Sequence, residues 1–225
     1  MELDLKKLEL RNVNDKLQNL DRKTHGRDFT IINPEGNHAI CAGLDKEMNV
    51  TIKGHVGYYC AGMNKKATII IEGNVGTGVA ENMMSGKVHV KGNASQSAGA
   101  TAHGGLLIID GDASSRCGIS MKGADIIVKG SVGHMSGFMS QSGNLIVCGD
   151  AGEALGDSLY ETKIYIKGNV KSLGADFVEK KMDKKHINKL RKYLKDAEIK
   201  NHKAQSLKRY GSAIKLYNFK INNKE

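Results

Sequence analysis

The chain has 225 residues, of which 27 are glycine and only one is proline, with four cysteines and a formal net charge of +10. This length suits one domain with a tail, and glycine without proline excludes collagen-like and linker-type compositions. No apolar run approaches the roughly 18 residues that cross a bilayer, and the N-terminus has no signal-peptide pattern. We therefore expect a cytoplasmic protein without membrane contact, with reduced cysteines and with its glycines at structured corners.

Residues 1–48 precede any repeat and are predicted to form an N-terminal helix and capping segment. Within them, residues 12–20 align Val13, Leu17 and Leu20 on one helical face.

A repeat of 19 residues runs through residues 49–176. Each copy has a short run of β-favouring residues that ends at a glycine. Four and two residues before that glycine, every copy carries Val, Ile or Leu, as at Val50 and Ile52. Alternation with period two places both side chains on one face, which we expect to be the core. The glycine column is Gly54, Gly73, Gly92, Gly111, Gly130, Gly149 and Gly168.

After the column glycine, six copies continue with the pattern G-x-x-[GS]-x-x-x-[GA], as at Gly54, Gly57 and Ala61. Small residues suit tight corners, where equivalent positions of neighbouring coils stack about 4.8 Å apart. The pattern predicts an all-β fold, a right-handed parallel β-helix of about seven coils, roughly 34 Å long, with short terminal helices.

Residues 177–225 form a basic C-terminal helix and tail, which holds the whole net charge of +10. The neutral remainder has no basic surface of the kind that binds nucleic acid, so nucleic-acid binding would depend on the Lys-rich tail alone. Residues 183–199 place Ile187, Leu190, Leu194 and Ala197 on one helical face, with Asp183 as the N-cap.

The repeat resembles the GXGXG domain, which forms the C-terminal β-helix of the glutamate synthase large subunit and also occurs in formylmethanofuran dehydrogenase. It is most similar to stand-alone versions in split archaeal-type glutamate synthases and N-methylglutamate synthase complexes. The segments that carry the resemblance are Ile52–Asn64, Ala80–Gly86, Ser95–Thr101, and the tail segments Arg209–Ala213 and Leu216–Phe219.

The resemblance implies a scaffold subunit that is not itself catalytic. It implies packing against a class II glutamine amidotransferase subunit and an FMN-binding glutamate synthase subunit, which would carry the FMN and the iron–sulfur cluster. The alternative is the GXGXG-domain polypeptide of a formylmethanofuran dehydrogenase-type complex, with molybdenum- or tungsten-containing partners.

No catalytic, cofactor-binding or metal-ligating residues are predicted in this chain. Cys60 and Cys117 share a column but lie three coils apart, about 14 Å, which is too far for a disulfide. No cysteine or histidine spacing matches a metal site. An enzyme acting alone would need an acid/base pair on one face, and the histidines of the array fall in four different columns: His55, His89, His103 and His134.

Three surface features are predicted. Alternating charges just before the column glycines, as at Lys91, Asp110 and Lys129, indicate a ladder of ion pairs. Tyr58, Tyr59 and Arg116 are candidate interface residues in the loop columns. Methionines in the third segment of each coil are predicted to fill the core; they are Met63, Met83, Met84, Met121, Met135 and Met139.

Between the two core positions of each strand lies an apolar stripe that should face outward. Soluble chains rarely leave such a stripe uncovered, so we expect a terminal helix, or otherwise a partner subunit, to lie on it. Ile108, Ile127 and Ile146 are therefore further candidate interface residues. The stripe consists of Ile70, His89, Ile108, Ile127, Ile146 and Tyr165.

Overall fold

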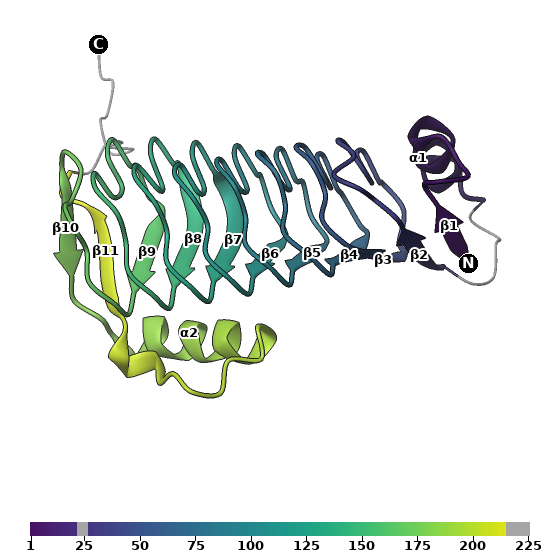
Figure 1. The fold of residues 1–225 in the computed structure, drawn as a ribbon. Helices are drawn as coiled ribbons and strands as arrows, with labels where there is room; N and C mark the ends of the chain where they lie inside the picture. Colours follow the sequence, from purple (N-terminus) through teal and green to yellow (C-terminus); the bar gives the residue numbers. More distant parts are fainter. Residues whose placement is uncertain (22–26, 215–225) are drawn as a thin grey trace, which may run out of the picture.

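The computed structural model describes residues 1–21 and 27–214 and shows a parallel β-solenoid (Figure 1). One sheet of 11 strands runs along it in the order β1-β2-β3-β4-β5-β6-β7-β8-β9-β11-β10. Within the described ranges, no helix is long and apolar enough to cross a membrane. The strands are β1 (Glu2–Asp4), β2 (Asp28–Ile32), β3 (Asn49–Lys53), β4 (Thr68–Ile71), β5 (Lys87–Val90), β6 (Leu106–Ile109), β7 (Lys122–Val128), β8 (Ser142–Val147), β9 (Lys163–Ile166), β10 (Phe177–Lys180) and β11 (Lys208–Ser212).

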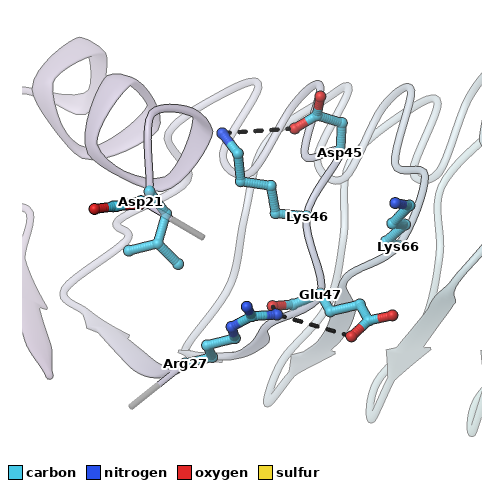
Figure 2. A pocket seen from close by; sticks show the side chains of 7 residues that line it. Asp21, Arg27, Asp45, Lys46, Glu47 and Lys66 are labelled. Atoms are coloured by element: carbon cyan, nitrogen blue, oxygen red, sulfur yellow. Dashed lines mark hydrogen bonds and ion pairs between the residues drawn. The ribbon is translucent and has the colours of Figure 1, made fainter. Parts of the chain in front are cut away.

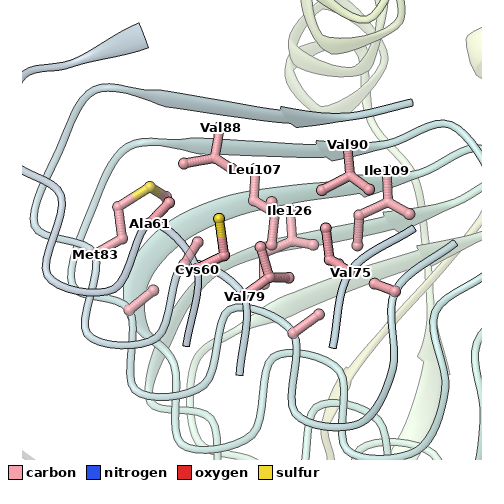
Figure 3. Packing of buried hydrophobic residues seen from close by; sticks show 14 of the residues in the cluster. Cys60, Ala61, Val75, Val79, Met83, Val88, Val90, Leu107, Ile109 and Ile126 are labelled. Carbon is pink, nitrogen blue, oxygen red and sulfur yellow. The ribbon is translucent and has the colours of Figure 1, made fainter. Parts of the chain in front are cut away.

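The strand register confirms the 19-residue repeat. Val50 pairs with Ile69, and Ile69 pairs with Val88, in parallel ladders that continue to β9. Both predicted core positions of every repeat strand, from Val50 to Ile166, are fully buried, because alternation turns these two apolar columns into the solenoid. Figure 3 shows Val88 and Val90 packed inside the coil opposite side chains from the turn segments. The predicted parallel β-helix is therefore correct.

The solenoid begins one coil earlier than residue 49. β2 pairs in parallel with β3, but Asp28 faces Asn49, a spacing of 21 residues rather than 19. The loop between β2 and β3 has two additional residues, so this coil does not follow the strict 19-residue period. β1 extends the sheet further by pairing with β2.

Helix α1 (Leu10–Gln18) caps this end of the solenoid. Val13 and Leu17 are buried in the main core, as their helical spacing predicted. The Asn14 side chain donates to Ala39 O at 2.9 Å and accepts from Cys41 N at 2.9 Å. Gln18 Nε2 donates to Ala42 O at 2.8 Å. Polar side chains of α1 thus satisfy backbone groups that a next coil would otherwise pair.

A ladder of side-chain acceptors follows the glycine column, and it explains why that column is glycine. Asn93 Oδ1 accepts from Asp112 N at 2.8 Å, and Asp112 Oδ1 accepts from Ser131 N at 2.7 Å. A Cβ on Gly111 would overlap Asn93 Oδ1 and lie 3.0 Å from Gly92 O. The ladder has six such bonds, of 2.6–3.0 Å, whose acceptors are His55, Asn74, Asn93, Asp112, Ser131 and Asp150.

The turn segment of each coil alternates residues of positive φ, which explains the last position of the repeated pattern. In one coil the values are +73° at Gly78, +55° at Ala80 and +55° at Asn82. The flanking positive-φ positions also hold large residues such as Tyr59 and Met63, but the middle position is buried in every copy, so Gly or Ala recurs there. In the next coil the position equivalent to Ala80 is Gly99, where φ is +66°.

Helix α2 (Lys184–Asp196) lies along the outer face of the sheet beside β6 to β9 (Figure 1). Asp183 is the N-cap, as predicted, and its side chain accepts from His186 N at 2.9 Å. Leu190, Leu194 and Ala197 are buried against the stripe. Asn144 Nδ2 donates to the Tyr193 hydroxyl at 3.1 Å and joins the helix to β8. A terminal helix of the same chain therefore covers the stripe at Ile108, Ile127, Ile146 and Tyr165, while Ile70 stays half-buried beyond the helix.

The tail after α2 turns back onto the solenoid through a 3-10 helix at Ala204–Ser206. β11 then pairs antiparallel with β9 on one side and with β10 on the other. The tail segment Arg209–Ala213 thus lies largely in a strand that its basic composition did not predict. The other tail segment, 216–219, lies outside the described residues.

Candidate functional site

Cysteines and histidines of the described residues do not form a reactive centre. All four cysteines are free and buried, and burial raises the pKa of Cys60 and of Cys117 to about 12. Among residues 1–21 and 27–214, no cluster of three His, Cys, Asp or Glu side chains could hold a metal ion. His55 belongs to the acceptor ladder, where its Nδ1 accepts from Asn74 N.

One charged cluster lies just beyond the part of the sheet that α2 covers. His89 Nε2 lies 2.8 Å from Asp110 Oδ1, and Lys129 Nζ approaches the same oxygen at 2.8 Å. Lys91 Nζ lies 3.6 Å from Asp110 Oδ2, so the predicted charge ladder forms around Asp110. Glu72, the next acidic member, makes no ion pair within the described chain. The contacts around Asp110 link three successive coils, since His89, Asp110 and Lys129 belong to the β5, β6 and β7 coils.

Burial and ion pairing set the charges of this cluster. Burial lowers the pKa of His89, although its bond to Asp110 opposes that effect. Burial alone would raise the pKa of Asp110, but hydrogen bonds from Lys129 and His89 outweigh it and the pKa is lowered. The folded state therefore favours a neutral imidazole beside an ionised carboxylate.

We expect His89 to make the protein less stable in mild acid. Its folded pKa is lowered, so below the unfolded value of about 6.5 the unfolded chain takes up the proton first and stability falls. The free energy of urea unfolding should therefore fall more between pH 7.5 and 5 for the wild type than for His89→Gln, by at most about 1.4 kcal/mol per pH unit. Equal losses in both proteins would contradict the assignment.

The three predicted loop residues lie on the turn side of the coils. Tyr58 is 55% exposed and stacks on His38 of the preceding coil, with ring centroids 3.6 Å apart. Tyr59 and Arg116 occupy the same column, three coils apart, and both have positive φ. Arg116 is exposed and Tyr59 is half-buried. The structure thus places all three on one side, but it does not bring them into mutual contact.

The interface assignment of Ile108, Ile127 and Ile146 requires correction. All three are 0% exposed because α2 of the same chain packs on them. A partner could reach them only after α2 had moved away. These residues therefore belong to a second buried apolar cluster, between the sheet and α2, and not to the surface.

The methionines divide between the core and the surface. Met83 and Met121 are fully buried, as predicted. Met63 is 45% exposed, Met84 43% and Met139 42%, so the core interpretation was wrong for these three. Each exposed methionine lies in a column of turn residues that faces outward, next to a column that faces the core. Apolar character alone does not reveal whether a turn side chain faces inward or outward.

A cavity of about 360 Å³ lies beside the N-terminal cap (Figure 2). Its charges largely compensate one another, since Arg27 lies 3.7 Å from Glu47 and Lys46 lies 3.9 Å from Asp45. Lys46 Nζ also donates to Gln18 O. Lys46 and Arg27 thus join the cap to the first coils.

A second cavity, of about 480 Å³, opens between the last turn of α2 and residues 198–205. We call it the α2 groove. Leu194, Ile199 and Ala204 form its apolar floor, and Arg191, Lys195, Lys200 and Lys203 form its rim. Sequence reasoning missed this groove, because its two walls meet only when the tail turns back.

Comparison with known proteins places the chain in a family. No family model matches it. Protein GlxC of Rhizobium meliloti (strain 1021) is 54% identical over 221 residues, which cover 98% of this chain and 97% of that protein. The chain belongs to the GlxC family.

The similarity to Protein GlxC extends over the whole architecture described above. A match over 98% of the chain necessarily includes α1, the solenoid, α2 and β11. The basic tail therefore lies within the region that is similar to Protein GlxC. Its surfaces are candidates for function, as is the turn side of the coils.

Proposed function

We propose that the chain is a non-catalytic scaffold subunit of a glutamate synthase-type, glutamine-dependent oxidoreductase complex. In this proposal it packs against a class II glutamine amidotransferase subunit and an FMN-binding glutamate synthase subunit. The FMN and an iron–sulfur cluster reside in the synthase subunit, and ammonia released by the first partner is used by the second.

The observation that carries the proposal is the repeat itself. Its seven-glycine column and G-x-x-[GS]-x-x-x-[GA] pattern resemble the GXGXG domain, and the structure folds these copies into one parallel solenoid. A rigid solenoid offers extended surfaces to partners and suits a scaffold. No observation favours the alternative of a formylmethanofuran dehydrogenase-type complex.

Co-expression with the products of the adjacent genes tests this function. A tagged full-length chain should co-elute in gel filtration with a class II glutaminase and an FMN-containing synthase, in fixed stoichiometry. If the chain elutes alone while both partners are present and folded, the proposed function is wrong.

Variants of the same chain test the predicted interface. Tyr58→Ala combined with Arg116→Glu should reduce recovery of the complex about tenfold, because aromatic and arginine side chains dominate interface energetics. Arg11→Glu provides a matched control, since this arginine is exposed on α1 at the capped end. Equal recovery of both variants would exclude this interface while leaving the scaffold function intact.

A further inference from the structure

The α2 groove combines an apolar floor with a strongly cationic rim. Of the floor residues, Leu194 and Ala204 are buried, and Ile199 is half-buried and keeps apolar surface open to a ligand. The volume of about 480 Å³ falls within the range of binding pockets. The groove is therefore large enough to hold apolar side chains of a ligand.

The positive charge of the rim is not balanced by ion pairs within the described part of the chain. Arg191, Lys195, Lys200 and Lys203 are exposed, and none of them makes an ion pair with a carboxylate in residues 1–21 and 27–214. Glu198 is the single acidic residue among the described residues that line the groove. An acidic ligand would therefore gain several ion pairs without displacing existing ones.

His202 also lines the groove, between Lys200 and Lys203 of the rim. Its Nδ1 is buried and makes no hydrogen bond within the described residues, so the polar contacts of an occupant are with the exposed rim cations. The walls are held by the end of α2, where Ile199 N donates to Leu194 O at 2.8 Å.

Two other classes of occupant fit less well. A basic amphipathic helix binds membranes through its apolar face, but α2 buries Leu190 and Leu194 on the sheet. A nucleic-acid backbone would use the cations but would leave the apolar floor open to water. The combination of floor and rim favours a ligand that carries carboxylates and bulky apolar side chains together.

We propose that the α2 groove binds an acidic peptide segment of a partner polypeptide. Apolar side chains of that segment pack on Ile199, and its carboxylates pair with the cationic rim. The proposal deepens the proposed scaffold function and rests on it for the identity of the partner. It adds a second contact, on the α2 side of the solenoid, to the one expected on the turn side.

Fluorescence anisotropy with the full-length chain tests the groove directly. The probe is a fluorescein-labelled peptide that alternates glutamate with leucine, compared with an all-glutamate peptide and with an oligothymidylate of equal charge. The glutamate–leucine probe should bind roughly tenfold more tightly than the other two. Equal or tighter binding of the oligothymidylate would overturn the proposal in favour of a nucleic-acid site.

Charge-matched variants locate the binding. Lys195→Gln combined with Lys203→Gln should weaken probe binding roughly tenfold, because two rim cations are lost. Lys184→Gln combined with Lys185→Gln removes the same charge from the exposed first turn of α2 and should leave binding unchanged. Equal weakening by both variants would show nonspecific attraction to a basic helix and would overturn the proposal.

A photo-crosslinking amino acid at position 203, in the chain co-expressed with both partners, separates the two proposals. A crosslink to an acidic segment of either partner supports the groove. An intact complex without this crosslink overturns the groove as a partner site and leaves the scaffold function standing. If no complex forms but the probe still binds as expected, the proposed scaffold function fails while the groove remains a peptide-binding site.

Discussion

Replacing Gly111 by alanine is expected to destabilise the solenoid by about 2–4 kcal/mol, although the change adds a single methyl group. The new Cβ would overlap Asn93 Oδ1 and lie 3.0 Å from Gly92 O. Asn93 would have to turn away and release Asp112 N, with which it now forms a 2.8 Å hydrogen bond. Urea unfolding followed by circular dichroism measures the loss.

A double-mutant cycle identifies the cause of that loss. Asn93→Ala alone removes the hydrogen bond, at a cost of about 1 kcal/mol. Combined with Gly111→Ala, it should cost at least about 1 kcal/mol less than the sum of the two single changes, because the bond is lost only once. Gly211→Ala is the control, since its Cβ would meet only Lys180 Cγ at 3.8 Å and its effect should be small. Strict additivity would show that the acceptor ladder does not explain the glycine column.

Replacing Leu190 by aspartate is expected to cost more than about 3 kcal/mol and to release α2 from the sheet. Leu190 is fully buried against the stripe that includes Ile127 and Ile146. A carboxylate there has no partner among the surrounding apolar side chains. Its burial would be so unfavourable that the helix should detach and expose the stripe. Urea unfolding and binding of a hydrophobic dye report the two effects.

Asn188→Asp introduces the same charge two residues earlier on an exposed part of α2. The new carboxylate can still accept from Arg191, which now donates to Asn188 Oδ1 at 3.2 Å. We expect a change within about 0.5 kcal/mol and no increase in dye binding. If Leu190→Asp behaved like Asn188→Asp, α2 would not be packed on the stripe as described.

The 19-residue repeat made most of the fold predictable, but coils that depart from the strict period could not be recognised from the sequence. The coil that starts at Asp28 is offset from the next by 21 residues, so it fell outside the column. The acceptor ladder did leave a signal, because every column glycine is followed by His, Asn, Asp or Ser. That signal becomes specific only when neighbouring coils place each side chain against the next backbone N–H.

Surface assignments depended on packing that a pattern cannot supply. Ile108 and Ile127 have the spacing of an outward-facing stripe, yet they are buried because a helix from the tail returns to them. Met63 and Met139 are as apolar as Met83, but their columns face outward. The direction of a turn residue follows from the positive φ values around it, which sequence alone did not specify.

The sequence by itself determined the parallel solenoid, its inward columns and the amphipathic faces of α1 and α2, because alternation and helical spacing depend on local geometry. Only the tertiary structure decided what covers the stripe, how β11 joins the sheet, and that a cationic groove lies beside α2. The covered stripe and β11 bring together residues far apart in the chain, and the groove forms because the segment after α2 turns back on the helix. Their contacts arise from the free energy of burying apolar surface between elements, which no single segment expresses.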